Sequence, residues 1–202
     1  MPDKNLVVLG IPRGGVVVAG QVSRQLNAQL DVVLSRKIGA AGNPELAIGS
    51  VGEDGKLFLN EDLASRVGAD KVYIETERFR QLEEIRSRIQ RFRQTKEKVP
   101  LKDKIVIVTD DGVATGATMQ AALWAVRQEK PKELIAAIPV GAKESVELLV
   151  DHADKVIVLR VPDYFAAISQ FYLHFEQTSD SEVLQILKES VDIKGSSKGS
   201  IK

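Results

Sequence analysis

Two adjacent carboxylates, followed by a loop of small residues, stand near the middle of the chain. Asp110 and Asp111 come just after the apolar run 105–108, and an apolar helix is expected from about Met119. The loop in between consists of Gly112, Val113, Ala114, Thr115, Gly116, Ala117 and Thr118. The first N–H groups of a helix lack intrahelical partners and the helix dipole favours negative charge, so this loop is a candidate anion site. The carboxylates would repel a bare polyphosphate but accept hydrogen bonds from vicinal hydroxyls, so the pattern indicates a phosphorylated sugar.

A second loop that could approach an anion lies near the N-terminus. Pro12, Arg13, Gly14 and Gly15 follow the apolar run 6–11. Glycines at this place allow the backbone to turn sharply and to bring its N–H groups close to a ligand, and Arg13 adds positive charge. Taken alone, the same residues are more typical of a plain tight turn.

Two basic residues close the next apolar run. Arg36 and Lys37 follow residues 30–35, which are expected to form the second strand. Exposed basic residues are common at strand ends, so by themselves they indicate little. On the ligand edge of a sheet, however, two cations would offset the charge of an anionic ligand.

Apolar runs alternate with helical patterns along most of the chain. The expected strands are 6–11, 30–35, 46–51, 57–59, 105–108, 134–140 and 155–161, and the expected helices are 16–26, 72–98, 118–127, 143–150 and 181–190. Unbroken Val, Ile and Leu runs in such an alternation predict an α/β fold: a doubly wound, mainly parallel sheet with helices on both faces. Ligands in these folds bind beyond the carboxyl ends of the strands, where both loops are expected.

Some segments depart from the alternation. A Gly-containing turn between 46–51 and 57–59 predicts a β-hairpin insertion. The long charged helix 72–98 has an apolar stripe of Phe79, Leu82, Ile85, Ile89 and Phe92, and we expect it to be a solvated face or a subunit contact. Residues 162–178 are aromatic and irregular and form a small C-terminal cap. We expect one domain over 1–193 and a disordered tail over 194–202.

Composition excludes several classes of function. The 202 residues include no cysteine and two histidines, so disulfides, a thiol nucleophile and a thiolate metal site are excluded. A formal net charge of zero argues against a dedicated nucleic-acid binder. No apolar run approaches the ~20 residues that cross a bilayer, and no secretory signal opens the chain. We therefore expect a cytoplasmic protein with no membrane contact.

The central motif has a specific resemblance. Residues 106–118, Val-Ile-Val-Thr-Asp-Asp-Gly-Val-Ala-Thr-Gly-Ala-Thr, resemble the 5-phosphoribosyl-1-diphosphate (PRPP) motif of type I phosphoribosyltransferases. The resemblance implies that Asp110 and Asp111 hold the ribose 2- and 3-hydroxyls and that 114–118 wrap the 5-phosphate, with Gly112 and Val113 as further PRPP-binding residues. The alternative is a strand–turn–helix junction with aspartate as a turn former and threonine as a helix cap.

The other segments match the same family. Residues 12–15 resemble its diphosphate-binding loop, and Arg36 with Lys37 resembles the Arg-Lys pair of adenine phosphoribosyltransferases. Residues 39–60 occupy the place of its flexible catalytic loop, which implies a mobile segment. Within it Asn43, Glu45 and Asn60 are either site contacts or turn and cap residues. The segment 162–178 stands where the family has its hood, and Phe165 and Tyr172 are the candidates for holding a nucleobase.

The resemblance implies an activity. A phosphoribosyltransferase, which is a pentosyl-transferring glycosyltransferase of nucleotide metabolism, moves ribose 5-phosphate from PRPP to a nitrogenous base and releases diphosphate, with Mg²⁺ held mostly by substrate oxygens. Ala114 stands where hypoxanthine-type enzymes carry an acidic residue, which argues against that acceptor. The alternatives are a PRPP-binding regulator without turnover and a sugar-phosphate hydrolase. Similar folds are usually dimers, so a homodimer is an expectation.

A narrower resemblance concerns a group of bacterial predicted phosphoribosyltransferases whose acceptor is generally unassigned. The runs 12–15, 36–49 and 176–183 resemble that group. Its members usually carry another helix before the first strand, whereas this chain starts at the strand. If such a helix is missing, we expect an exposed apolar flank.

Overall fold

A five-stranded parallel sheet forms the centre of the protein. The computed structural model describes residues 3–192, and the strands of this sheet follow the order β2-β1-β6-β7-β8. They are β1 (Asp3–Gly10), β2 (Ala28–Val32), β6 (Ile105–Thr109), β7 (Glu133–Val140) and β8 (Lys155–Arg160). The predicted fold class is confirmed, with β6 as the middle strand. The predicted tail, 194–202, lies outside the described residues.

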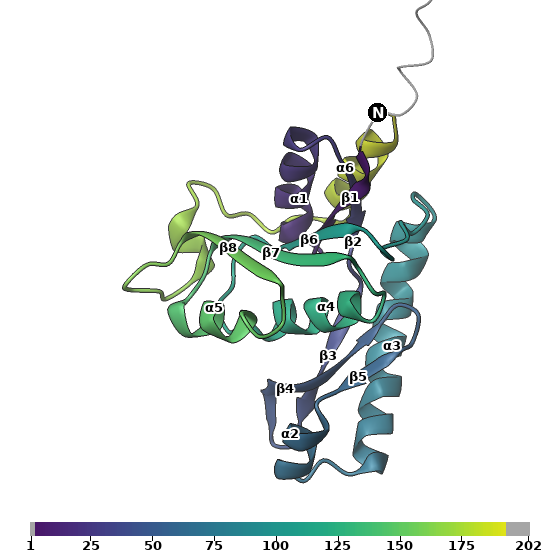
Figure 1. Cartoon of the computed structure of the whole chain (residues 1–202), viewed down its shortest axis with the longest axis vertical. Coiled ribbons are helices and arrows are strands. Elements are labelled where there is room, and N and C mark those ends of the chain that lie inside the picture. The colour runs from purple at the N-terminus through teal and green to yellow at the C-terminus, as the bar shows by residue number, and fades with distance from the viewer. Residues whose placement is uncertain (1–2, 193–202) are drawn as a thin grey trace, which may run out of the picture.

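Helices cover both faces of this sheet, as its unbroken apolar strands require. On one face lie α1 (Gly14–Gln25) and α6 (Asp180–Asp192), and on the other α4 (Ala117–Arg127) and α5 (Lys143–Leu149) (Figure 1). Successive strand residues point to opposite faces: Val8 belongs to the cluster around α1, whereas Val7 and Leu9 belong to the cluster around α4. On β8 at the sheet edge, Leu159 remains 83% exposed.

A second, smaller sheet projects from the first as a separate lobe. It is antiparallel, in the order β3-β4-β5, with β3 (Ser35–Ala40), β4 (Asn43–Gly52) and β5 (Leu57–Leu59). The predicted hairpin is confirmed in the pairing of β4 with β5. Two short helical elements were not predicted, α2 (Glu61–Arg66) and the 3-10 turn η1 (Ile168–Phe171). Figure 1 shows the lobe below the main sheet, flanked by α3 (Lys71–Arg93).

The structure corrects the interpretation of the second strand. The run 30–35 does not form one strand that ends at a pair of cations: β2 ends at Val32, and the chain crosses Val33 and Leu34 into the second sheet. Arg36 and Lys37 therefore lie inside β3. The segment 39–45, predicted as a loop, contains the end of β3, the hairpin turn and the start of β4, with Gly42 at a φ of +80°.

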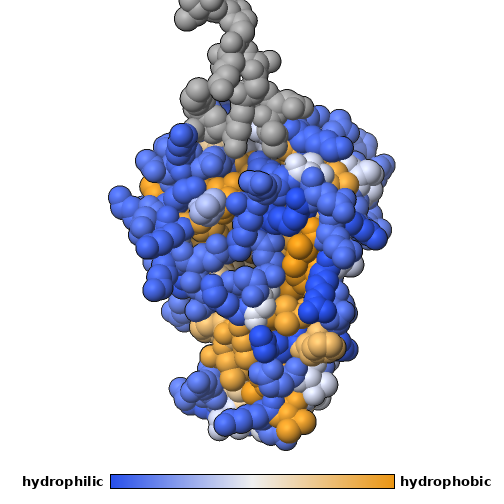
Figure 2. Space-filling model, turned by 90° about the vertical axis from the view of Figure 1, so that its right-hand side faces the viewer, coloured by the Kyte–Doolittle hydropathy of each residue, from blue (hydrophilic) through white to orange (hydrophobic). Residues whose placement is uncertain are grey.

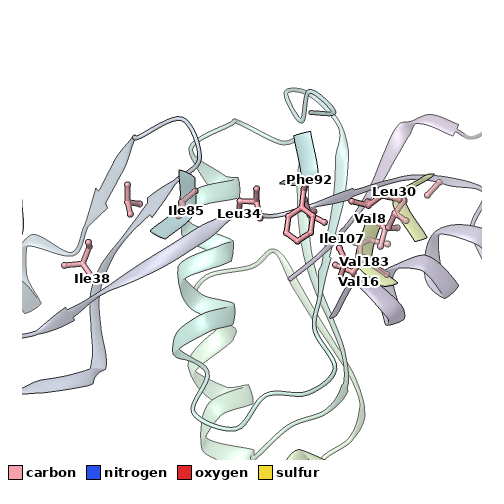
Figure 3. Close-up of a cluster of buried hydrophobic side chains, with 14 of the residues drawn as sticks. Val8, Val16, Leu30, Leu34, Ile38, Ile85, Phe92, Ile107 and Val183 are labelled. Atoms are coloured by element: carbon pink, nitrogen blue, oxygen red, sulfur yellow. The ribbon is translucent and has the colours of Figure 1, made fainter. Parts of the chain in front are cut away.

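The two lobes share one apolar core. Leu34, Ile38 and Ile85 of the small lobe belong to the same cluster as Val8, Leu30 and Ile107 of the main sheet. Figure 3 shows these side chains in a row that runs from one lobe to the other, with Phe92 of α3 at the junction. Because α3 contributes both Ile85 and Phe92, it joins the small lobe to the main sheet. None of the helices over residues 3–192 is both long and apolar enough to span a membrane.

Helix α3 differs from its prediction at both its end and its apolar stripe. It ends at Arg93, short of the predicted Lys98, and Phe79 is 64% exposed. The buried stripe is Ile74, Gln81, Ile85 and Phe92. Phe79 lies six residues before Ile85, about 120° away around the helix. Figure 2 looks onto the side that carries α3 and shows a mostly hydrophilic face with a narrow apolar band and a lower apolar patch.

Candidate functional site

The parallel pairing of β1 with β6 brings the two predicted loops together. Gly10 pairs with Thr109, so residues 11–15 and 110–116 leave the same edge of the sheet side by side. Gly15 lies against Asp110 and Gly14 against Asp111: a Cβ on Gly14 would stand 2.0 Å from the Asp111 Oδ2, which no side chain can do. Glycine is required here by the close approach of the acidic pair. The Pro12–Arg13 peptide bond is cis.

The two carboxylates are held against each other at this edge. The Asp111 N–H donates to Oδ1 of Asp110 at 2.9 Å. Burial and then the neighbouring Asp111 charge raise the pKa of Asp110 to about 8, against opposing hydrogen bonds from the backbone of Asp111 and Gly15. Burial also raises the pKa of Asp111. At neutral pH the free pair therefore holds a proton, and a ligand that donates hydrogen bonds would favour its release.

The loop that follows the pair leads to an uncapped helix N-terminus. Gly116 is the N-cap of α4, with a φ of +80° and no side-chain cap, so the alternative in which a threonine caps this helix is wrong. The backbone N–H groups of Ala117 and Thr118 have no acceptor among the described residues. The loop itself is tied down by Val113, whose N–H donates to the Val140 carbonyl at 2.9 Å. An ordered loop with free donors is what an anion site needs.

The predicted cations lie near this edge but are already paired. Arg13 is 3.9 Å from the carboxylate of Asp180 on α6. Arg36 forms an ion pair with Glu84, and Lys37 lies 3.0 Å from Glu45. Arg36 and Lys37 are consecutive in β3, so their side chains leave opposite faces of that strand. Glu45, a candidate for either a site contact or a turn residue, thus lies beside a cation of the cavity wall.

A cavity of about 540 Å³ opens between the small lobe and the loops. Its wall includes Pro12 of the first loop, Thr118 of the second, and both Arg36 and Lys37. The far wall is α3, which contributes Arg88 among other polar side chains. Sequence reasoning missed this contribution, because the spacing of α3 residues gives only which face they share and not what lies opposite.

The C-terminal aromatic segment reaches the acidic pair through one residue. The Tyr172 hydroxyl donates to the backbone carbonyl of Asp111, and burial and then the charge of Asp111 raise the pKa of Tyr172. Phe165 instead stacks on Phe171 with ring centroids 5.5 Å apart. A Cβ on Gly112 would clash with Ile168, so the segment lies directly on the loop. Of the two hood candidates, the structure brings Tyr172 to the site.

The remaining candidates from the small lobe have structural contacts. Asn60 caps α2, since its side chain accepts from the Leu63 N–H at 3.0 Å, as the cap interpretation predicts. Asn43 is the first residue of β4, next to the hairpin turn. Neither is placed against Asp110 or Asp111 by a described hydrogen bond.

Comparisons with known proteins agree with this geometry. The family model described as "Phosphoribosyl transferase domain" matches residues 1–176. A "Putative phosphoribosyl transferase" of Mycobacterium tuberculosis (strain H37Rv) is 41% identical over 187 residues, which are 93% of this chain and 42% of that protein. The chain thus spans about two fifths of the length of the curated relatives it matches.

A solved structure is similar over nearly its whole length. The crystal structure of TT1426 from Thermus thermophilus is 48% identical, with a TM-score of 0.88 over 92% of this chain and 88% of that one. The family match covers most of the chain, and the sheet order and the joined loops fit it. The chain belongs to the phosphoribosyl transferase domain family, a family of glycosyltransferase-type enzymes.

Proposed function

We propose that the protein transfers ribose 5-phosphate from PRPP to a nitrogenous base and releases diphosphate. The observation that carries this proposal is the contact of Gly14 and Gly15 with the acidic pair, beside the uncapped N-terminus of α4. The two carboxylates, which would accept hydrogen bonds from hydroxyls, lie between two loops whose backbones can face anions, and this arrangement supports the proposal. PRPP has vicinal hydroxyls between phosphates at both ends. Its hydroxyls would match the acidic pair, and its two phosphate ends would match the two loops.

Each part of the site has a role in this reaction. The carboxylates of Asp110 and Asp111 accept hydrogen bonds from the ribose hydroxyls, and residues 112–118 with the free N–H groups of α4 bind the 5-phosphate. Residues 12–15 receive the diphosphate. The anomeric carbon passes through an oxocarbenium-like state, so the protein acts mainly by positioning the reactants and stabilising the leaving group. Asp111 also steadies positive charge that develops on the ribose.

Magnesium fits this donor set as an ion that arrives with the substrate. Among residues 3–192 no group of three or more His, Cys, Asp or Glu side chains could hold a metal by itself. The pair Asp110 and Asp111 could add oxygens to a shell that is otherwise filled by diphosphate, ribose and water, as magnesium prefers. When bound, the ion would neutralise charge on the leaving diphosphate.

The acceptor side of the site is formed by the C-terminal segment. Tyr172, whose hydroxyl donates to the Asp111 carbonyl, supplies aromatic surface for a planar base, and Phe165 stacks on Phe171 elsewhere in the same segment. Ala114 offers no acid or base; its carbonyl accepts from the Ser145 hydroxyl. We therefore expect an acceptor that does not need an acidic residue at this position, as in adenine-type rather than hypoxanthine-type transfer.

The test is to incubate the full chain with PRPP, magnesium and a panel of bases, and to measure nucleotide and diphosphate together. Nucleotide and diphosphate in equal amounts with one base support the proposal. Tight PRPP binding with no product from any base would show a regulator instead. Phosphate or diphosphate released without an acceptor would show a hydrolase. Sedimentation of the same sample tests the homodimer, and fractionation of cells tests the cytoplasmic location; both are part of the proposal.

A further inference from the structure

The cavity beside the loops has a strongly cationic wall. Of the side chains that line it, Arg36, Lys37, Arg80 and Arg88 carry positive charge and Glu77 carries negative charge. Two of these cations come from α3, which belongs to the small lobe and not to the central sheet. A cavity with this excess of cations favours an anion of several charges.

Arg88 is the cation on this wall that forms no ion pair with any described residue. Arg36 pairs with Glu84 and Lys37 with Glu45, and Arg80 pairs with Glu77. No ion pair within 4.0 Å and no hydrogen bond joins the Arg88 guanidinium to any residue in the part of the chain that the structure describes. Burial first, and then the charges of Arg36 and Arg13, lower the pKa of Arg88.

The guanidinium groups of Arg36 and Arg88 line this cavity, and that of Arg13 lies close enough to act on Arg88. Arg13 belongs to the first loop, Arg36 to β3 and Arg88 to α3, and their mutual repulsion is offset only in part by Asp180 and Glu84. Like charges held together in a protein are relieved by a bound ion of opposite charge. A guanidinium also binds phosphate oxygens through two parallel hydrogen bonds.

We propose that this cavity receives the diphosphate end of the donor and that Arg88 of α3 binds it directly. The inference rests on the proposed function, since it assigns one end of PRPP. Pro12 lies on the cavity wall next to the first loop, so the anion reaches the cavity from the edge where the acidic pair holds the ribose. The small lobe then acts as a binding element and not only as a cover.

Helix α3 offers a matched control. Arg86 lies two residues before Arg88, pairs with Glu83 on the surface, and is not on the cavity wall. Arg86→Gln and Arg88→Gln remove the same charge from the same helix. Arg88→Lys keeps the positive charge but cannot form the bidentate hydrogen bonds of a guanidinium. Neither Arg88 variant breaks an ion pair, so both should fold, which thermal unfolding would check.

The experiment is calorimetric titration of the full chain with inorganic diphosphate, with and without magnesium, and with ribose 5-phosphate. We expect Arg88→Gln to weaken diphosphate binding by about ten-fold to a hundred-fold. Ribose 5-phosphate affinity should not change, Arg86→Gln should match the wild type for both ligands, and Arg88→Lys should recover part of the loss.

The outcomes separate this inference from the transferase proposal. Equal diphosphate affinity in the wild type and Arg88→Gln, or no diphosphate binding by the wild type, overturns the inference even if PRPP is turned over. Diphosphate binding that depends on Arg88, together with no product from any base, supports the inference while the transferase proposal fails.

Discussion

Two groups of charged residues in this protein are built in opposite ways. Where β2 meets the small lobe, Asp31 is 1% exposed and accepts from Arg93 at 2.7 Å and from the Val99 N–H at 2.8 Å. Glu53 accepts from Arg93 at 2.9 Å and also pairs with Lys98. At the loops and the adjoining cavity, by contrast, Asp110 adjoins Asp111, and the positive charges of Arg36 and Arg13 act on Arg88.

The difference lies in what completes each group. In the network around Asp31, opposite charges satisfy one another inside the chain, so burial, which acts to lower the pKa of Arg93, is outweighed by Asp31 and Glu53, which raise it. At the loops like charges adjoin, and the chain supplies too few partners. The first group holds the two lobes together, and the second is suited to a ligand that brings hydroxyls and phosphates.

The largest expected effect tests the network of ion pairs around Asp31. Arg93→Met leaves the buried Asp31 charge without its main partner, and we expect it to lower the free energy of unfolding by about 3–5 kcal/mol. Urea unfolding measures this as a lower midpoint at constant slope. Arg86→Met removes an exposed pair from the same helix and should cost about 0–1 kcal/mol. Equal losses in the two variants would show that the network does not differ from a surface pair.

The next largest effect tests the acidic pair of the candidate site. Replacing both Asp110 and Asp111 by Asn removes both negative charges and turns one acceptor oxygen of each side chain into an NH2 donor. We expect turnover of PRPP to fall at least about 100-fold, or about 2.7 kcal/mol. The affinity for inorganic diphosphate should persist, because Arg88 and the first loop are intact. Asp103→Asn, at an exposed carboxylate before β6, is the control. PRPP binding that survives in the double variant would remove the ribose assignment.

The sequence was sufficient where local pattern and tertiary structure agree. The strand 105–109, the acidic pair and the start of α4 follow one another along the chain. The spacing of the apolar residues changes there from a continuous strand-like run to a helical repeat, which can be seen in the sequence. The break at Val33 and Leu34 was not visible. Both residues are apolar and continue the run from β2. What changes across them is the partner strand, since β2 pairs with β1 whereas β3 pairs with β4.

The same distinction applies to the site. Gly14 and Gly15 were predicted as a loop that could face an anion, but their contact with the acidic pair depends on the register of β1 with β6. Arg88 could be placed on a helix from its spacing, but its two cationic neighbours come from other elements. A side chain that binds a ligand does not need a partner residue within the chain, so no second residue in the sequence indicates its role.

A smaller effect concerns the pH dependence of stability. The pKa of Asp110 is raised in the folded protein to about 8, above its ordinary value of 3.8, so the folded state holds this proton more tightly than the unfolded state. The contribution to stability is therefore present at low pH and is lost as pH rises from about 4 to about 8. We expect Asp110→Asn to flatten this slope and to stabilise the protein by at least about 1 kcal/mol at pH 8.5. An unchanged slope in urea unfolding from pH 5 to 8.5 would contradict the raised pKa.

The smallest effect concerns a buried polar cluster that is neutral. The Trp124 indole N–H donates to Nδ1 of His152 at 3.1 Å, and the Gln120 amide lies 2.7 Å from Nε2. Because an indole can only donate, Nδ1 of His152 is the acceptor, and the neutral ring carries its proton on Nε2. Burial lowers the pKa of His152, with Asp151 acting in the opposite direction, so protonation occurs below its ordinary 6.5 and breaks the bond to Trp124.

Trp124 is the only tryptophan of the chain and therefore reports this event by itself. We expect its fluorescence to change with a midpoint below pH 6.5. As pH falls through the same range, the free energy of unfolding should drop by less than about 1 kcal/mol, because the folded state binds this proton more weakly than the unfolded state. His152→Gln should abolish the transition, whereas His174→Gln, at an exposed histidine, should leave it intact. A transition that survives in His152→Gln would assign it to another group. Its loss would place this cluster with the network around Asp31, as polar groups that satisfy one another without a ligand.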